Sequence, residues 1–113
     1  MPNNKNTVIK IKGADAFNRK VLNGSGLQIV RFCAEWSGPC QIMGPIYEEM
    51  FTLYKDAASF YKIDIDEVPL LKELLSISEL PTIIIYKNSV IVEIVVGLIA
   101  RDALIARLEK IIK

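Results

Sequence analysis

The segment that most constrains the fold is a mostly apolar run that ends in a tight turn. Leu27–Cys33 contains Arg31 but is otherwise typical of a central strand buried on both faces of a sheet. The turn Trp36-Ser37-Gly38-Pro39 follows, and a helix is expected over residues 40–54. Pro45 lies inside that helix and should kink it, because proline removes a backbone donor and clashes with the preceding turn.

The other elements alternate along the chain. Strands are expected at 7–11, 59–65, 82–86 and 90–96, and helices at 15–22, 68–75 and 101–112. Asp15 and Asp66 are expected to cap two of the helices, and Lys87-Asn88-Ser89 has the pattern of a hairpin turn. Alternation that ends in a hairpin predicts an α/β fold with a mixed sheet and helices on both faces.

The composition of the 113 residues indicates one globular domain over 1–113, with 51% apolar and 24% charged residues. Fourteen basic and 13 acidic residues leave a net charge of +1, which gives no reason to expect a nucleic-acid partner. The longest apolar stretch of the C-terminal half, residues 94–100, is too short to cross a bilayer. The N-terminal residues lack the apolar core of a signal peptide, so we expect a cytoplasmic protein without membrane association.

The chain has two cysteines, Cys33 and Cys40, and no histidine. Two thiols without imidazole cannot complete a four-ligand zinc site within one chain. Histidine-assisted acyl or phosphoryl transfer is also excluded. We therefore expect no metal and no cofactor.

Several short motifs occur in the order found in one known family. Residues 32–40 resemble the active-site segment of thioredoxins, with Ser37 in place of the first cysteine of Trp-Cys-Gly-Pro-Cys. The other matches are the helix proline Pro45, the strand Lys62-Ile63-Asp64-Ile65-Asp66, the loop Leu80-Pro81-Thr82 with its cis-proline, and Gly97. The chain resembles a thioredoxin over nearly its whole length, which implies the thioredoxin fold, a central mixed five-stranded sheet flanked by four helices.

The resemblance implies a thiol–disulfide oxidoreductase of cell redox homeostasis that docks an extended peptide segment of a protein partner. The docking residues would be Trp36, Gly38, Pro39, Leu80, Pro81 and Gly97. The cis-proline would present the preceding backbone to the peptide; an ordinary structural proline is the competing interpretation of Pro81. A thioredoxin-reductase-like partner is implied if a parent with both cysteines exists.

Three departures from the family pattern fall around the expected reaction centre. Ser37 replaces the attacking cysteine, Arg31 replaces a buried aspartate that takes a proton from the second cysteine, and Cys33 replaces a tryptophan. A hydroxyl cannot form a sulfur–sulfur bond, so reduction of disulfides by a dithiol is expected to be lost. Three clustered changes favour natural divergence over one laboratory substitution, and whether Ser37 is native or engineered stays open.

The remaining thiols and Ser37 have specific expectations. Ser37 should cap the helix with its side-chain oxygen rather than act in catalysis. Cys40 should lie in the first helical turn, where the helix dipole, Arg31 and Lys62 favour a thiolate and burial favours an inert thiol. Cys33 and Cys40 are expected to remain two free thiols, because a strand end and the next helical turn usually fail the geometry of a disulfide.

Two further positions carry alternatives. Arg31 in a buried strand should pair with Asp64 or Glu35, or extend its charged end to solvent. The strand at 90–96 should lie at the sheet edge, where it could pair with another chain. Coverage by helices on both faces is the preferred explanation of its apolar composition.

Two hypotheses of function follow. The first is a member of the thioredoxin family without dithiol turnover, in which Cys40 is the only available thiol and reacts through a mixed disulfide or a sulfenic acid. The second is a redox-inert binding module that recognises a peptide with the same groove. Thiol reactivity of Cys40 in the folded protein separates the two.

Overall fold

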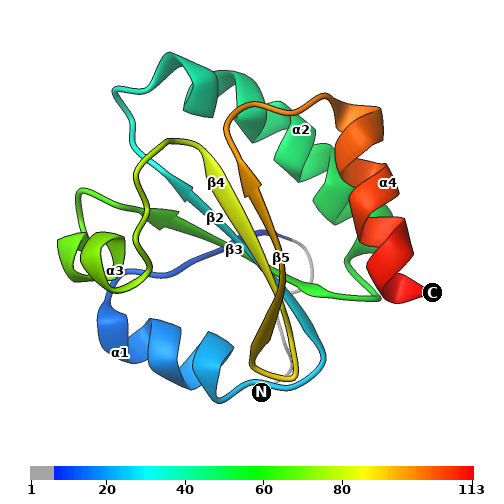
Figure 1. Ribbon diagram of the computed structural model, residues 1–113, viewed down its shortest axis with the longest axis horizontal. Coiled ribbons are helices and arrows are strands. Elements are labelled where there is room, and N and C mark those ends of the chain that lie inside the picture. Colours follow the sequence, from blue (N-terminus) through cyan, green and yellow to red (C-terminus); the bar gives the residue numbers. More distant parts are fainter. Residues whose placement is uncertain (1–6) are drawn as a thin grey trace.

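The computed structural model describes residues 7–113, which form a five-stranded mixed sheet with helices on both faces (Figure 1). The elements are β1 (Ile9–Lys10), α1 (Ala14–Phe17) continued by a π-helical turn (Asn18–Leu22), β2 (Leu27–Cys33), α2 (Gly38–Tyr54), β3 (Ser59–Asp64), α3 (Pro69–Leu74), β4 (Thr82–Lys87), β5 (Val90–Val96) and α4 (Arg101–Ile112). The strand order is β1-β3-β2-β4-β5. Strands β1, β3 and β2 are parallel, whereas β4 is antiparallel to both β2 and β5. None of the helices in this part of the chain is long and apolar enough to cross a membrane.

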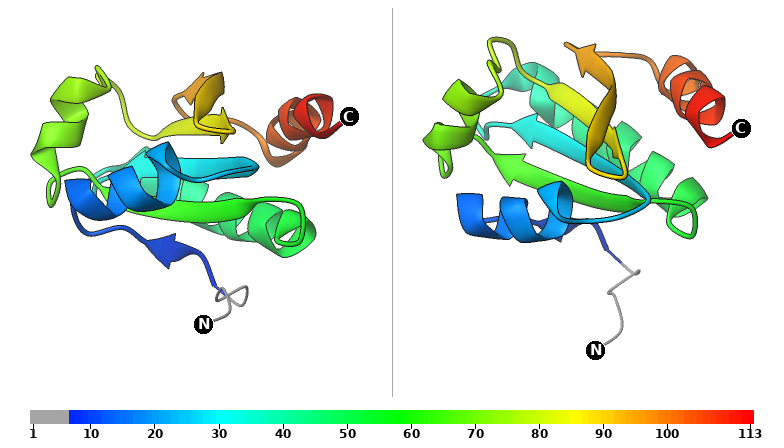
Figure 2. Two further views of the ribbon diagram at one scale, coloured as in Figure 1. Left: turned by 90° about the horizontal axis from the view of Figure 1, so that it is seen from below. Right: turned by 60° about the horizontal axis from the view of Figure 1, so that its bottom comes forward.

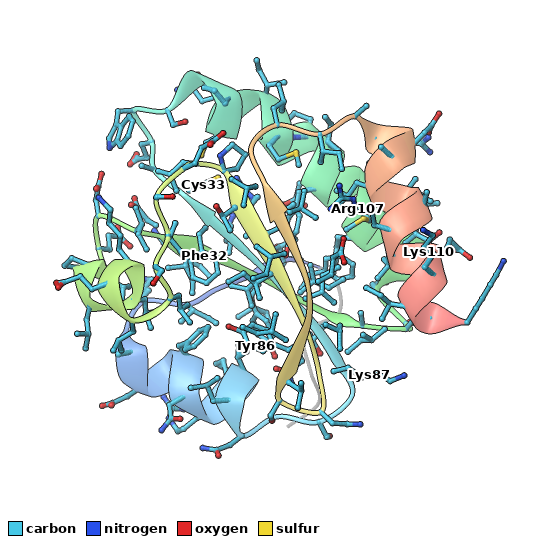
Figure 3. All side chains as sticks on the ribbon, viewed as in Figure 1. Phe32, Cys33, Tyr86, Lys87, Arg107 and Lys110 are labelled. Carbon is cyan, nitrogen blue, oxygen red and sulfur yellow. The ribbon has the colours of Figure 1, made fainter. Side chains whose placement is uncertain are left out.

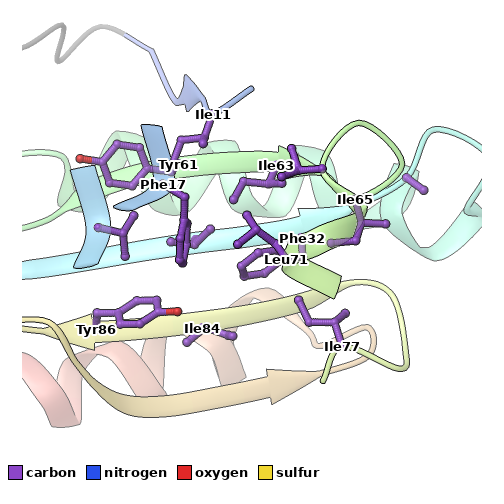
Figure 4. Packing of buried hydrophobic residues seen from close by; sticks show 14 residues of the cluster. Ile11, Phe17, Phe32, Tyr61, Ile63, Ile65, Leu71, Ile77, Ile84 and Tyr86 are labelled. Carbon is purple, nitrogen blue, oxygen red and sulfur yellow. The ribbon is translucent and has the colours of Figure 1, made fainter. Parts of the chain in front are cut away.

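Two separate hydrophobic clusters join the sheet to the helices on its two sides. Figure 2 shows these helices on either side of the sheet. One cluster joins the sheet to α1 and α3, with Phe17, Phe32, Leu71 and Tyr86 among its buried side chains (Figure 4). The other joins the sheet to α2 and α4 through residues such as Met43 and Leu104. Strand β2 supplies Val30 and Phe32 to the first cluster and Ile29 to the second, so it is buried on both faces as expected.

Two expected helix caps are wrong. Helix α1 begins one residue before Asp15 and is preceded by Gly13 without a side-chain cap; the expected single helix over 15–22 becomes a π-helical turn after Phe17. Helix α3 follows Val68, whose apolar side chain cannot cap it, and Pro69 occupies its first turn. Asp66 lies too far upstream to cap it and bonds elsewhere.

The hairpin between β4 and β5 is confirmed. Its turn residues Asn88 and Ser89 have φ angles of +51° and +72°, the left-handed pair that a two-residue type I′ turn requires. The turn is also tied to the loop before β2. The Asn88 side chain accepts a 2.8 Å hydrogen bond from the backbone N–H of Gly26, and the Ser89 hydroxyl donates to the Gly24 carbonyl at 2.9 Å.

Strand β5 lies at the sheet edge, as expected, but the explanation of its composition by coverage on both faces is wrong. Val90, Ile91, Val92, Ile94 and Val96 are 41–62% exposed, and only Val95 is buried. Helix α4 covers one face, where Arg107 forms a 2.8 Å ion pair with Glu93. The opposite face of β5 is left apolar and exposed, since α1 and α3 pack over strands nearer the sheet centre.

Candidate functional site

Ser37 is the N-cap of α2. Its φ and ψ of −87° and 117° are extended, and its Oγ accepts a 3.3 Å hydrogen bond from the backbone N–H of Cys40. Pro39 follows in the first turn, where no backbone donor is needed. The predicted capping role of Ser37 is confirmed, and the helix begins two residues earlier than expected.

A hollow of about 370 Å³ lies beside this cap, and we call it the groove. Five residues expected at the site line it: Trp36, Ser37, Gly38, Pro39 and Leu80. The others come from the end of β3 and the segment around α3: Ile65, Asp66, Lys72, Ile77 and Ser78. The groove thus combines the turn before α2 with the loop before β4, which are far apart in sequence.

Pro81 and Gly97, which were also expected at the docking site, are not among the residues that line the groove. The Leu80–Pro81 peptide bond is cis, and the Pro81 carbonyl accepts a 2.8 Å hydrogen bond from the N–H of Gly97. Gly97 has a φ of +86°, and a Cβ there would lie 2.9 Å from Oε2 of Glu79. The backbone conformation is what favours glycine at this position, because the Glu79 carboxylate is the end of a flexible side chain and can move aside.

Trp36 is held at the rim of the groove by Asp66, which was expected to cap a helix instead. Its ring is 71% exposed, and its Nε1–H donates a 2.8 Å hydrogen bond to Oδ2 of Asp66. The Asp64 side chain in turn accepts from the backbone N–H of Asp66 at 2.9 Å. Asp66 is therefore a positioning residue for Trp36, a role that no local sequence pattern indicates.

A second hollow, of about 400 Å³, is lined by both cysteines and by Arg31, and we call it the thiol hollow. Arg31, Cys33, Cys40 and Lys62 line it, together with residues that the sequence did not single out, including Lys10, Glu35, Gln41 and Asp64. Among the described residues, the groove and the thiol hollow share no lining side chain. The expected site residues are therefore divided between two separate hollows.

The strand registers explain why these residues meet. Arg31 and Cys33 are two residues apart in β2, so both point to the face covered by α2. Arg31 is opposite Lys62 in β3, and Lys62 is opposite Lys10 in β1, which sets three cations in a row across the sheet. Lys62 is half-buried at the centre of this row.

Arg31 has partners that the sequence did not suggest. Its Nη1 donates a 3.0 Å hydrogen bond to the Cys33 sulfur, and its guanidinium carbon lies 5.3 Å from the ring centre of Tyr47, within cation–π range. Its Nε is buried without a hydrogen-bond partner among residues 7–113. In that same part of the chain Arg31 pairs with neither Asp64 nor Glu35, so the expected carboxylate partner is wrong.

The two cysteines are free thiols, as predicted. Burial is the main cause that raises the pKa of Cys33 to about 12, a hydrogen bond with the Cys40 thiol raises it further, and the charge of Arg31 opposes both. Cys33 is therefore a neutral thiol at physiological pH. Cys40 is 3% exposed and lies directly beside it.

The buried Tyr47 fixes the sheet beneath the thiol hollow. Its hydroxyl donates to the carbonyls of Ile29 at 2.9 Å and Tyr61 at 2.7 Å, bridging β2 and β3. Burial raises its pKa well above the usual range, so it stays neutral and is not an acid–base group. Within residues 7–113 no group of three or more acidic or cysteine side chains is arranged to hold a metal ion.

A five-stranded mixed sheet, a capped turn at the start of α2 and a cis-proline loop beside it define a thioredoxin-fold protein. The family model Thioredoxin matches residues 8–110, and on that match the chain belongs to the thioredoxin family, whose members are thiol–disulfide oxidoreductases. It is 39% identical to Thioredoxin-2 of Saccharomyces cerevisiae over 90 residues, covering 80% of this chain and 86% of that protein. It is 36% identical to thioredoxin of Staphylococcus aureus over 103 residues, covering 91% and 96%.

Solved structures agree with this assignment. The thioredoxin of Malassezia sympodialis superposes with a TM-score of 0.85 at 30% identity, covering 95% of this chain and 92% of that one. The thioredoxin of Plasmodium falciparum gives a TM-score of 0.83 at 35% identity, covering 91% and 98%. The predicted fold is confirmed.

Proposed function

We propose that this chain keeps the peptide-docking groove of the thioredoxin family but cannot reduce disulfides through position 37. The observation that carries the proposal is the hydrogen bond between the Ser37 Oγ and the Cys40 N–H at 3.3 Å. It gives the hydroxyl a capping role at the place where the family mechanism needs a sulfur nucleophile. A serine with no base to activate it is a poor nucleophile and forms no mixed disulfide.

Docking is supported by the groove itself. An extended segment of a protein partner would lie against the exposed face of Trp36 and the loop at Leu80, where backbone groups can pair with it as with an added strand. Cys40 lines the thiol hollow behind Ser37 instead of the groove, so a docked segment does not meet its sulfur directly. A reductase of the thioredoxin-reductase kind would find a dithiol at this turn only after cysteine is restored at position 37.

The experiment compares insulin reduction by dithiothreitol in the presence of the wild type, Ser37→Cys and Cys40→Ser. The proposal expects the wild type and Cys40→Ser to remain at the background rate, and Ser37→Cys to accelerate insulin precipitation. Ser25→Cys, which adds a thiol at an exposed loop position, is the control for an extra cysteine outside the groove. Wild-type turnover that disappears in Cys40→Ser would refute the proposal.

Docking is tested separately by NMR with S-carboxymethylated insulin B chain as an extended peptide without reactive sulfur. Amide shifts confined to the groove at Gly38, Ser78 and Leu80, and weakened by Trp36→Ala, are expected. Shifts scattered over the surface, or centred on β5, would contradict docking at the groove.

A further inference from the structure

We propose that Cys33 and Cys40 are a redox pair, which a hydroperoxide entering the thiol hollow closes into an intramolecular disulfide. The pair is separate from the groove and does not depend on Ser37 as a reacting residue. The pair would give the chain a dithiol between the end of β2 and the first turn of α2, and not within the turn at positions 37–40.

The geometry of the two thiols is the first argument. Cys33, labelled in Figure 3, is the last residue of β2 and lies on the face of the sheet that α2 covers. Cys40 lies in the first turn of that helix. Both side chains line the thiol hollow, and the two thiols are close enough to influence each other's charge. Formation of a disulfide shortens such a contact to a bond of about 2.05 Å.

Both backbones are fixed at this contact. The Cys33 carbonyl accepts a 2.8 Å hydrogen bond from the N–H of Ile65, and the Cys40 N–H donates to Ser37. The two sulfurs are therefore held beside each other by the sheet and the helix cap, not by a flexible loop. Such an arrangement favours a bond within the chain over a bond between two chains.

Access to the sulfurs is the second argument. The hollow of about 400 Å³ is bordered by the exposed residues Lys10, Glu35 and Gln41. Cys33 is half-buried there and Cys40 is 3% exposed, so an oxidant of a few atoms is favoured over the disulfide of a folded protein. A hydroperoxide meets that condition.

The charges around the sulfurs are the third argument. Lys10, Lys62 and Arg31 form the row of cations across β1, β3 and β2, while the carboxylates of Glu35 and Asp64 also line the hollow. Arg31 donates its hydrogen bond directly to the Cys33 sulfur. Positive charge beside a thiol opposes the effect of burial on its pKa, and it also stabilises the negative charge that leaves a peroxide.

The reaction balances as two steps. The Cys40 sulfur, in the first turn of α2, attacks the peroxide: an S–O bond forms, the O–O bond breaks, and the leaving alkoxide takes a proton to become an alcohol, or water from hydrogen peroxide. The Cys33 sulfur then attacks the Cys40 sulfenic acid, its proton leaves with the hydroxyl as water, and the S–S bond forms. Two thiols are oxidised by two electrons, and one peroxide bond is reduced.

The test treats the folded wild type with one equivalent of hydrogen peroxide at pH 7, blocks free thiols with N-ethylmaleimide and measures the intact mass. We expect a monomer that has lost 2 Da and takes up no maleimide. Cleavage after Glu35 separates the two cysteines along the chain, so the two fragments should remain linked until dithiothreitol is added.

Single-cysteine variants show which of the two cysteines reacts first with the peroxide. Cys33→Ser should stop at the sulfenic acid of Cys40, which dimedone traps, and Cys40→Ser should keep Cys33 reduced. Ser37→Asn, which keeps a capping side chain, should still form the disulfide, and this separates the inference from the proposed function at position 37. Near-ultraviolet circular dichroism checks that each variant is folded.

Three results would overturn the inference. One is a wild type that accumulates oxidised Cys40 without a link to Cys33. Another is a disulfide-linked dimer as the main product, and the last is two maleimide labels after peroxide treatment. The wild-type fragment map alone decides between these and the intramolecular bond, even if a variant fails to fold.

Discussion

The Arg31 guanidinium donates a 3.0 Å hydrogen bond to the Cys33 sulfur, two residues further along the same strand. The resemblance marked both residues as departures from the family pattern, and within residues 7–113 they interact with each other and not with a carboxylate. The charge of Arg31 lowers the pKa of Cys33 against the larger effect of burial, which raises it to about 12.

Replacing Arg31 should therefore slow the chemistry of Cys33. Arg31→Met keeps an unbranched apolar stem and removes the charge, so the Cys33 pKa should rise further and its alkylation by iodoacetamide at pH 9 should slow several-fold. Peptide mass spectrometry reads the label at Cys33 separately from Cys40. Arg19→Met, at an exposed position after α1, is the matched control and should leave the rate unchanged.

The raised pKa of Cys33 also predicts how stability depends on pH. The folded state holds the thiol proton more tightly than the unfolded chain, whose ordinary value is 9.0. The contribution to stability is therefore complete below pH 9 and is lost as the pH rises toward about 12. Urea denaturation should show the wild type losing stability relative to Cys33→Ala between pH 8 and pH 10.5, and a constant difference would contradict the assignment.

Ser37 should contribute to stability through its cap. Ser37→Ala removes the acceptor of the Cys40 N–H and should lower the free energy of unfolding by about 1 kcal/mol. Ser37→Asn restores a good capping residue and should recover most of the loss, whereas Ser25→Ala, in an exposed loop, should have little effect. Equal stability of Ser37→Ala and the wild type in urea would show that the cap is not formed in solution.

Removing the hydroxyl should have opposite effects on stability at two buried tyrosines, Tyr47 and Tyr86. The Tyr47 hydroxyl donates to the carbonyls of Ile29 and Tyr61, so Tyr47→Phe should cost about 1–3 kcal/mol of stability. The buried Tyr86 hydroxyl has no hydrogen-bond partner among residues 7–113. Tyr86→Phe should consequently be neutral or stabilising, and a loss as large as that of Tyr47→Phe would disprove this difference.

The exposed apolar face of β5 should promote aggregation more than it stabilises the fold. Ile94 is 49% exposed on the edge strand, so Ile94→Lys should change stability by no more than about 0.5 kcal/mol. Lysine on an edge strand opposes pairing with another chain, so light scattering during refolding should fall. Val95→Ala, at the buried neighbour, should instead cost about 2 kcal/mol without this benefit.

The sequence predicted the strands and turns whose residue patterns are specific to one local structure. Strand β2 and the Asn88-Ser89 hairpin are where they were expected, because a run buried on both faces and a two-residue turn have local signatures. Asp66 shows the limit of such signatures. It has the side chain of a cap but bonds to Trp36, thirty residues away, so only the tertiary structure could reveal its role.

The sequence indicated which residues contribute to the candidate site, but not how these residues are arranged around one another. The sequence predicts a carboxylate partner or solvent for the charge of Arg31, whereas packing places a sulfur and an aromatic ring beside it. The apolar composition of β5 predicts coverage by helices, because an apolar edge face and a buried strand look alike in sequence. The closeness of Cys33 to Cys40 depends on how α2 lies over the sheet, which the spacing of the two residues does not specify.

Trp36 is the only tryptophan of the chain, and it stands mostly in solvent at the rim of the groove beside a carboxylate. The tryptophan fluorescence of the protein consequently comes from this one position. A peptide that settles against the ring will move that emission to shorter wavelength. The protein therefore carries a built-in fluorescent reporter of whatever it binds there, without any attached dye.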